Sequence, residues 1–339
     1  MKKNLFSPIN TALALGLVTL VGLTACSENN QTPTAQSTQT ATKTTDKEPA
    51  KDNKPAATPS AQAPISEITI AFATRRDTKD LQTKVDQVST ILSKEIGIPV
   101  KGVIGDETAS VEALRANRAS VAFLSGRAAL KAEQLSGAKM YLAEVRADYS
   151  GGKSYNAVFV VPDESPLKTL SDPQKTLEQL RGKRMAFTSR SSGSGFIFPV
   201  SELVGLKFVD GPDRLEQFFG KVTYGDGYSS ALQAVLREQA DVAVVSEYAL
   251  LPPWITAEEG KKLRVLHPVP NVPAHGIVID DGVPADIREK LINALLKLNE
   301  PANNELFRSL YNSTQLVKVD HEAHLASMRT AIQRAGLKP

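Results

Sequence analysis

Short apolar strand patterns alternate with helical patterns from Ile65 to the end of the chain, and this alternation limits the fold more than any other feature. Residues 68–73 form a continuous apolar run, and residues 77–96 then carry apolar side chains at helical spacing. Residues 121–124 have the composition of a buried strand. Apolar strands that alternate with helices predict layers of helices on largely parallel sheets. We therefore expect an α/β fold.

The rest of the chain continues the pattern and is long enough for two domains. Further strands are predicted at 100–104, 140–145, 157–161, 184–187, 221–224, 242–245, 263–266 and 276–279, and further helices at 110–117, 228–238 and 285–298. The first block of strands is too small to use all helices of the tail. We therefore expect one domain of residues 65–157 plus 269–339 and a second of residues 158–268, joined by a two-crossover hinge with a cleft between them.

The first 25 residues are typical of an export signal. Lys2 and Lys3 precede an apolar segment of residues 12–23, which is too short to span a bilayer permanently. It ends in Leu23-Thr24-Ala25-Cys26, which resembles the bacterial lipobox, in which the cysteine is lipidated. An ordinary secretory signal that ends near a cysteine is the alternative. Because Cys26 is the only cysteine, no disulfide forms within one chain.

Residues 26–64 are expected to form a lipidated cysteine followed by a disordered linker. Residues 27–64 contain no Val, Ile, Leu, Met, Phe, Tyr or Trp, so this segment cannot bury a core. As a flexible coil it reaches about 30–40 Å on average. We expect the protein to be exported and anchored to a membrane, facing the periplasm or the cell exterior.

The charge of the chain is nearly balanced, which argues against nucleic acid as a partner. The chain has 40 basic and 37 acidic residues, and removal of the signal leaves 38 basic residues. A nucleic-acid-binding domain would carry a basic field that this chain lacks. After the signal, no run of roughly 18 or more apolar residues occurs, so no later membrane span is expected.

A serine- and glycine-rich turn follows the strand predicted at 184–187. The sequence of residues 190–203 is RSSGSGFIFPVSEL, with Ser192, Gly193, Ser194 and Gly195 at its centre. A turn from a strand into a helix presents unpaired N–H groups and the positive end of the helix dipole. Glycines admit a ligand to the backbone, and serines add uncharged donors. The pattern favours a site for a tetrahedral oxyanion, although a plain helix cap gives the same pattern.

Other kinds of site lack support in the sequence. The chain contains no G-x-x-x-x-G-K-[ST] phosphate loop, no G-x-S-x-G nucleophile elbow, no H-E-x-x-H and no C-x-x-C. His321 and His324 are spaced to share a helix face, but near a surface tail we expect them to be solvated rather than metal ligands. We therefore predict no metal, no cofactor and no enzymatic turnover.

Three stretches resemble the PhnD-like family of phosphate, phosphite and phosphonate binding proteins of ABC transporters. They are LRANRASVAFL at 114–124, SGSGFIFP at 192–199, and ADVA at 240–243 taken with residues 269–279. The resemblance covers nearly everything from Ile68 onward. It implies the two-domain type II periplasmic binding protein fold, with two mixed, mostly parallel sheets joined by a two-crossover hinge.

The resemblance also implies a set of ligand contacts. Ser192 and Ser194 take the positions of the oxyanion cradle, whereas Gly193 stands where the family usually has threonine. Tyr155 matches a tyrosine beside the first crossover, where hinge packing is an equal alternative. Ser125 lies where phosphonate binders present a tyrosine, so that contact is absent or replaced by the Ser125 hydroxyl.

Several polar positions depart from the family pattern. Asp226 falls where several members place a histidine, Glu247 falls within one residue of an acidic contact, and His275 falls where phosphonate and phosphite binders carry an aspartate. Exchanging an acid for His275 removes a negative charge and adds a donor. Separately, Arg75 and Arg76 follow the first strand, and we expect Arg75 to reach the cleft as a charge-assisted donor.

The resemblance implies a lipid-anchored, substrate-binding component of an ABC importer. Such a protein captures a small oxyanion of the phosphonate, phosphite or phosphate kind in the interdomain cleft and delivers it to an inner-membrane permease. We expect a monomer. Two alternatives stay open: a ligand-loaded sensory protein that docks on a histidine kinase or chemoreceptor, and an enzyme built on the same fold.

Overall fold

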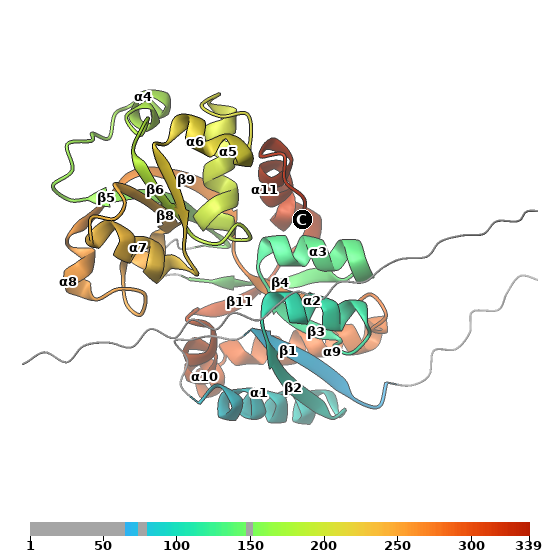
Figure 1. Cartoon of the computed structure of the whole chain (residues 1–339). Coiled ribbons are helices and arrows are strands. Elements are labelled where there is room, and N and C mark those ends of the chain that lie inside the picture. Colours follow the sequence, from blue (N-terminus) through green and yellow to red (C-terminus); the bar gives the residue numbers. More distant parts are fainter. Residues whose placement is uncertain (1–64, 74–79, 147–151) are drawn as a thin grey trace, which may run out of the picture. The chain divides into compact units, whose positions relative to one another are not determined.

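The computed structural model describes residues 65–73, 80–146 and 152–339 (Figure 1). The predicted signal peptide, Cys26, the linker and Arg75 lie outside the described residues. The described residues belong to one compact unit. No helix among them has both the length and the apolar character that crossing a bilayer requires.

The first sheet has six strands in the order β11-β4-β10-β3-β1-β2. Its strands are β1 (Ile68–Ala73), β2 (Val100–Gly105), β3 (Val121–Leu124), β4 (Lys139–Val145), β10 (Gly276–Ile279) and β11 (Gln315–Lys318). β1 pairs in parallel with β2 and β3, whereas β10 runs antiparallel to β3 and β4, and β11 runs antiparallel to β4. Four of the six strands, β1 to β4, therefore point the same way.

Helices cover both faces of this sheet because successive side chains of a strand point to opposite faces. Ile68, Ile70 and Phe72 of β1 pack in a cluster with α1 (Leu81–Ile96), α9 (Ala285–Leu296) and α10 (Pro301–Tyr311). Ala71 belongs to another cluster, with α2 (Glu107–Arg115), α3 (Gly126–Ser136) and α11 (His321–Arg334). The alternation along β1 thus separates two layers of helices.

The second sheet has five strands in the order β7-β6-β8-β5-β9. Its strands are β5 (Ser154–Pro162), β6 (Arg184–Phe187), β7 (Lys221–Tyr224), β8 (Val242–Ser246) and β9 (Leu263–Pro273). β6 is parallel to β7 and β8, whereas β5 is antiparallel to β8 and β9, so all strands except β5 point the same way. Both sheets are mixed with most strands in one direction, as predicted.

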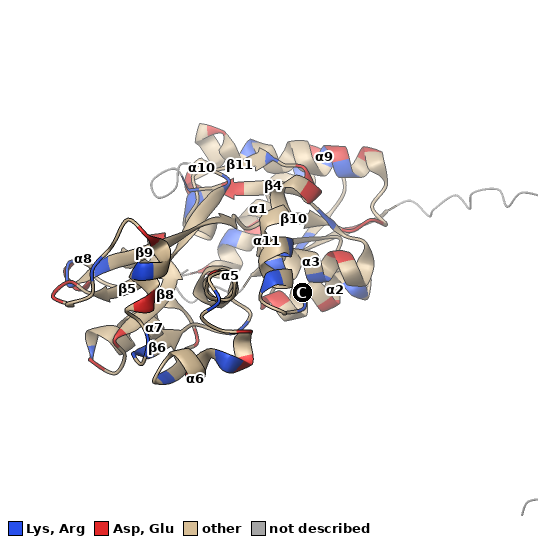
Figure 2. Cartoon of the chain, turned by 90° about the horizontal axis from the view of Figure 1, so that it is seen from above, with Lys and Arg blue, Asp and Glu red and all other residues tan. Residues whose placement is uncertain are grey.

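Short helices surround the second sheet. α7 (Tyr228–Leu236) packs on one face, and α5 (Phe198–Gly205) and α6 (Leu215–Phe218) pack on the other. The remaining helices are α4 (Pro173–Glu178), α8 (Ala257–Gly260), the π-helix η1 (Gly193–Ile197) and the 3-10 turns η2 (Pro212–Arg214), η3 (Glu247–Leu250) and η4 (Lys297–Asn299). Acidic and basic side chains are interspersed on the helices of both sheets (Figure 2).

Two strands carry the chain between the sheets, and one helix packs beside both. β5 and β9 pair antiparallel over their whole length, from Ser154 opposite Pro273 to Pro162 opposite Leu263. α11 contacts α3 beside the first sheet and α5 beside the second (Figures 1 and 2). The predicted domain boundaries fall inside β5 and β9, and they stay a prediction.

Some element boundaries differ from the predicted ones for local reasons. The helix predicted at 110–117 begins at Glu107, because the Asp106 side chain caps it by accepting the Ala109 N–H at 2.7 Å. β9 continues to Pro273, well beyond the predicted strand, because β5 supplies partners along its whole length. β11 was not predicted. It is a four-residue edge strand that pairs only with β4.

The prediction that His321 and His324 are solvated is wrong. His321 is only 5% exposed, and its Nδ1 accepts the Met140 N–H at 2.8 Å. His324 is half-buried, and its Nε2 lies 2.9 Å from the Ala274 carbonyl oxygen. α11 packs against α3, α5 and β9, which removes this face of the tail from water. Both rings therefore hold α11 in place.

Glu133, His321 and Glu322 come close enough together to surround a cation, but their bonding argues against one. Because Nδ1 of His321 accepts an N–H, its proton resides on Nε2, which leaves no lone pair for a metal. That Nε2 lies 3.4 Å from Glu133. Arg329 also contacts both carboxylates, Glu133 at 2.7 Å and Glu322 at 3.0 Å. The arginine already supplies the positive charge.

The stability of the α11 contact is expected to depend on pH through His324. Burial lowers the pKa of His324 from its ordinary 6.5, and the hydrogen bond to Ala274 offsets this only in part. Because the unfolded chain then binds the proton more readily, stability falls as pH drops through the unfolded pKa. Urea titrations from about pH 7.5 to about pH 5.5 should show a smaller loss of unfolding free energy in His324→Gln than in the wild type. Equal losses would contradict the assignment.

Candidate functional site

A cavity of about 200 Å³ lies where segments of both sheets meet the crossover strands. Its lining comes from the ends of strands, the starts of helices, the hinge and α11: Glu107, Ser125, Gly126, Tyr155, Ser189, Ser191, Ser192, Gly193, Tyr228, Val272, Pro273, His275 and Met328. Ser125 follows β3 and Ser189 follows β6, so each of these strands delivers its carboxyl end to the cavity. Ligands of α/β sheets bind at such ends.

The serine turn between β6 and α5 leads into a π-helix, η1. The Ser192 Oγ accepts the Gly195 N–H at 3.0 Å, and the Ser192 carbonyl accepts the Ile197 N–H at 3.0 Å. The wide turn continues directly into α5 at Phe198. The first N–H groups of a helix have no acceptor within it, and Ser192 and Gly193 both line the cavity. The turn therefore offers backbone donors and a hydroxyl to a ligand.

Ser194 lies behind the wall of the cavity rather than in it. Its side chain is completely buried, and its Oγ lies 2.7 Å from the Tyr228 hydroxyl. Ser194 also lies beside the Tyr155 hydroxyl, where it partly offsets the rise in the pKa of that hydroxyl. Tyr155 and Tyr228 themselves line the cavity. The structure therefore gives Ser194 the position of a residue that orients the Tyr228 hydroxyl, whereas Ser192 and Gly193 line the cavity.

Tyrosine rings form one wall of the site. The ring centroid of Tyr155 lies 5.1 Å from that of Tyr248, which in turn lies 5.9 Å from that of Tyr228. Burial raises the pKa of the Tyr155 hydroxyl, and the neighbouring tyrosines raise it further. Tyr155 therefore stays protonated and can act as a neutral donor. Tyr155 packs in the crossover strand β5 and lines the cavity, and its contact with a ligand stays a prediction.

Ser125 is bonded to a carboxylate that the sequence reasoning missed. Oε1 of Glu107 accepts the Ser125 N–H at 2.6 Å, and Oε2 accepts the Ser125 hydroxyl at 2.9 Å. Glu107 is the first residue of α2, directly after the Asp106 cap and the carboxyl end of β2. Its position just after a strand end could have marked Glu107 as a site residue in the sequence. Glu107 places a negative charge in the cavity.

His275 connects the cavity to a buried ion pair. Its Nδ1 lies 4.0 Å from Oε1 of Glu144. Arg146 donates to both Glu144 oxygens at 3.0 Å, and the two side chains are 4% and 1% exposed. Burial by itself would raise the pKa of Glu144, but the charge of Arg146, with His275 and the Ser313 hydroxyl, lowers it overall. The Arg146 guanidinium also lies 4.5 Å from the centre of the Tyr248 ring.

Two of the predicted contacts lie away from the cavity. Asp226 is exposed in the loop before α7 and is not part of the lining. Glu247 accepts the Asn156 N–H at 2.9 Å and the Asn156 side-chain amide at 2.8 Å. Asn156 belongs to the crossover strand β5, so Glu247 fixes this strand. Arg75 lies outside the described residues.

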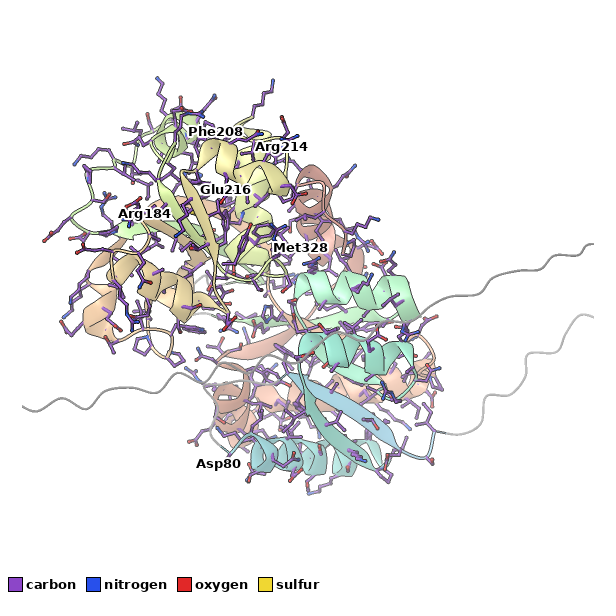
Figure 3. All side chains as sticks on the ribbon, viewed as in Figure 1. Asp80, Arg184, Phe208, Arg214, Glu216 and Met328 are labelled. Atoms are coloured by element: carbon purple, nitrogen blue, oxygen red, sulfur yellow. The ribbon has the colours of Figure 1, made fainter. Side chains whose placement is uncertain are left out.

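Gly193 explains one departure from the family pattern. A Cβ added at Gly193 would lie 3.1 Å from the Met328 Cε and 3.6 Å from Val272 Cγ1. Met328 comes from α11 (labelled in Figure 3) and fills the volume that a threonine side chain would need. The Met328 thioether therefore lines the cavity where a threonine at position 193 would place its hydroxyl.

The groups that line the cavity are suited to binding a small ligand. Its donors are hydroxyls and N–H groups, and Glu107 is its only carboxylate. None of the described lining residues is a lysine or arginine. The sequence reasoning missed Glu107, Ser189, Ser191, Tyr228 and Met328. Ser189 and Ser191 flank the quoted turn, and Tyr228 follows a strand end, but nothing local marked Met328.

Comparison with known proteins agrees with this geometry. The family model described as "ABC transporter, phosphonate, periplasmic substrate-binding protein" matches residues 70–324. The phosphonates-binding periplasmic protein of Escherichia coli K12 is 25% identical over 206 residues, which are 59% of this chain and 56% of that protein. The match thus spans little more than half of that relative.

Two solved structures resemble this one. A binding protein component of an ABC phosphonate transporter from Pseudomonas aeruginosa has a TM-score of 0.61 at 17% identity, covering 79% of this chain and 86% of that chain. A Prochlorococcus marinus protein in complex with methylphosphonate has a TM-score of 0.63 at 16% identity, covering 80% of this chain and 98% of that one. At these identities the likeness concerns the fold, and it confirms the predicted two-sheet α/β fold.

Proposed function

Because this chain belongs to the family of periplasmic substrate-binding proteins of phosphonate ABC transporters, we propose that it captures a small oxyanion for an ABC importer. The ligand is of the phosphonate, phosphite or phosphate kind and occupies the cavity of about 200 Å³. The observation that carries the proposal is the serine turn, which brings Ser192 and Gly193 to that cavity at the start of a helix.

The binding mechanism rests on neutral donors. The helix-start N–H groups and the Ser192 hydroxyl bond the oxyanion, with the hydroxyls of Tyr155 and Tyr228 beside them. A hydrogen bond to a charged group contributes about 1.5–3 kcal/mol after lost hydration is counted, so a few of them stabilise the bound anion. The paired strands β5 and β9 act as the hinge, and closure over the ligand removes the remaining water.

Glu107 restricts the charge of the ligand. An ionised carboxylate only accepts hydrogen bonds, and it retains free lone pairs beside its two bonds from Ser125. A fully ionised anion such as sulfate is repelled by it. An oxyanion that keeps a proton, or whose substituent carries a donor, satisfies it instead. The site is thus expected to prefer phosphonates over sulfate.

The cellular setting is part of the proposal. The chain is exported, lipidated at Cys26 and tethered by the linker of residues 27–64, and it delivers its ligand as a monomer to an inner-membrane permease. Family membership in ABC transport systems favours transport over the sensory alternative. It also favours a binding role over enzymatic turnover.

The ligand class and the role of Ser192 are tested together by thermal unfolding of the full chain. The panel holds phosphate, phosphite, methylphosphonate, aminoethylphosphonate and sulfate, with zwitterionic amino acids of zero net charge as controls. A ligand at 100 times its Kd adds about 2.7 kcal/mol of stability. Ser192→Ala should weaken binding about tenfold or more, because a hydrogen bond to the anion is lost.

Ser309→Ala is the matched control, because Ser309 is exposed on α10, and its hydroxyl bonds only the Leu306 carbonyl among the described residues. If no oxyanion raised the melting temperature while another compound did, the proposed ligand class would be refuted. Undiminished binding by Ser192→Ala would show that the turn is not the cradle.

A further inference from the structure

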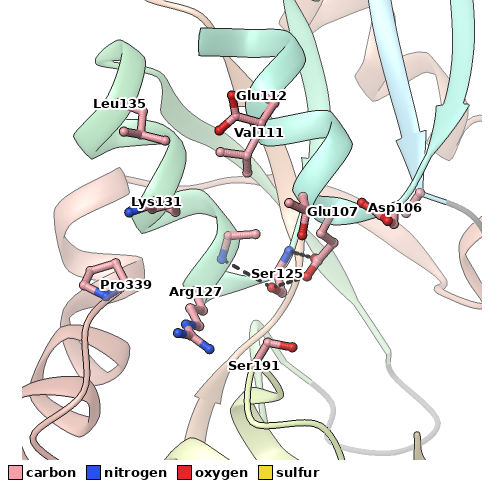
Figure 4. A pocket seen from close by; sticks show the side chains of 13 residues that line it. Asp106, Glu107, Val111, Glu112, Ser125, Arg127, Lys131, Leu135, Ser191 and Pro339 are labelled. Carbon is pink, nitrogen blue, oxygen red and sulfur yellow. Dashed lines mark hydrogen bonds between the residues drawn. The ribbon is translucent and has the colours of Figure 1, made fainter. Parts of the chain in front are cut away.

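A groove of about 610 Å³ opens beside the cavity, between α2 and α3 (Figure 4). It shares three lining residues with the cavity: Glu107, Ser125 and Ser191. The two spaces therefore meet at the serine turn. A bare oxyanion needs only the smaller one, which leaves the groove without a role in the proposed function.

The carboxylates of the groove already bond to the chain itself. Asp106 caps α2 through the Ala109 N–H, and Glu107 accepts both donors of Ser125. Glu112 accepts the Arg115 Nε–H at 2.7 Å. Glu112 is thus paired with a cation, whereas Asp106 and Glu107 have neutral donors and keep their negative charge.

The cations of the groove bond only neutral groups among the described residues. Arg127 donates to the carbonyl oxygens of Arg190 and Lys338, both at 3.1 Å. Lys131 lies one helical turn further on the same face of α3, and its Nζ lies 3.4 Å from the Gln134 side-chain oxygen. Burial lowers the pKa of the Arg127 guanidinium, and the Glu107 carboxylate offsets this only in part. Neither cation therefore bonds a carboxylate of the groove among the described residues, although Asp106 and Glu107 balance the two positive charges overall.

Apolar side chains line the groove between these charges. Val111 and Ala128 face it from α2 and α3, and Leu135 at its rim is 36% exposed. Figure 4 shows Arg127 and Lys131 of α3 on the groove side, with Ser191 below them. A chain of methylene groups that leaves the cradle would pass Arg127 and the apolar side chains and would meet Lys131 further along α3.

We propose that the groove binds the substituent of the ligand, and that this substituent is a short alkyl chain ending in a second anionic group, such as a carboxylate. The inference rests on the proposed function, because the phosphonate group must occupy the serine turn. Lys131 and Arg127 then determine specificity, with Lys131 bonding the distal anion and Arg127 holding the mouth of the groove at the Arg190 carbonyl.

Calorimetric titration of the full chain with four phosphonates tests this. The ligands are methylphosphonate, propylphosphonate, 2-carboxyethylphosphonate and 2-aminoethylphosphonate. Each buried methylene contributes about fourfold in affinity, so propylphosphonate should bind more tightly than methylphosphonate. The carboxyethyl ligand should bind about tenfold more tightly than the propyl ligand, through a charge-assisted bond, and that ratio should shrink as salt rises.

Lys131→Gln should bring the ratio between the carboxyethyl and propyl ligands close to one. Lys94→Gln, at an exposed lysine of α1 outside the groove, should retain it. A carboxyethyl ligand that binds no more tightly than the propyl ligand, or a ratio that survives Lys131→Gln, would overturn the inference. Tighter binding of the aminoethyl ligand would also overturn it, because Glu107 would then face the substituent. If no phosphonate binds at all, the proposed function itself fails, and the inference with it.

Discussion

Arg146→Ala is expected to lower the free energy of unfolding by about 3–5 kcal/mol, because it leaves a buried carboxylate without its partner. Glu144 is 1% exposed, and Arg146 donates to both of its oxygens at 3.0 Å. The arginine also donates to the Tyr311 carbonyl at 3.3 Å and lies over the Tyr248 ring. The Ser313 hydroxyl is then the main remaining donor to a charge that water cannot reach.

Chemical denaturation of wild type and variant measures this loss. The matched control is Arg115→Ala, which breaks an exposed pair with Glu112 at 2.7 Å whose side chains are 53% and 42% exposed. Exposed pairs contribute about 0–1 kcal/mol, because solvent screens them. A loss in Arg146→Ala no greater than in Arg115→Ala would contradict the view that the buried pair supports the cavity wall. Because Tyr248 packs against Tyr155, ligand affinity should fall as well.

Gly195→Ala is expected to cost about 3 kcal/mol of stability, the upper part of the range for overpacked sites. A Cβ at Gly195 would lie 1.9 Å from Oγ1, 2.7 Å from Cγ2 and 2.8 Å from Cβ of Thr188. Rotating the threonine cannot relieve the clash, since its Cβ itself is too close. The turn must shift, and the Gly195 N–H loses its bond to the Ser192 Oγ.

Gly195→Ala should therefore weaken oxyanion binding as well as lower the stability of the fold. Thermal unfolding with and without methylphosphonate reports both effects. Gly211→Ala is the control, because its backbone is extended and no atom lies within 4 Å of an added Cβ. We expect Gly211→Ala to stay within about 0.5 kcal/mol of wild type. If Gly195→Ala retained both stability and ligand shift, the tight turn against Thr188 would not be needed for the cradle.

The order of helices and strands could be predicted from the sequence because it depends on local patterns. Apolar runs such as 121–124 and 242–245 lie in buried strands, and the spacing in 81–96 forms α1. The serine turn was visible for the same reason, since a strand end and a helix start are neighbours in the chain. β11 escaped prediction because four residues at a sheet edge carry too little periodicity.

Local sequence patterns thus predicted the α/β class, most of the order of the elements and the position of a serine turn at a strand end. Which side chains meet at that turn depends on tertiary packing. Ser192 and Ser194 are alike in sequence, but one lines the cavity while the other is buried under Tyr155 and Tyr228. Glu107 and Met328 reach the cavity from helices far apart in the chain, whereas Asp226 and Glu247 are carried away from it. Local patterns predict where the backbone forms helices and strands, whereas contacts between distant segments depend on how the sheets and α11 pack.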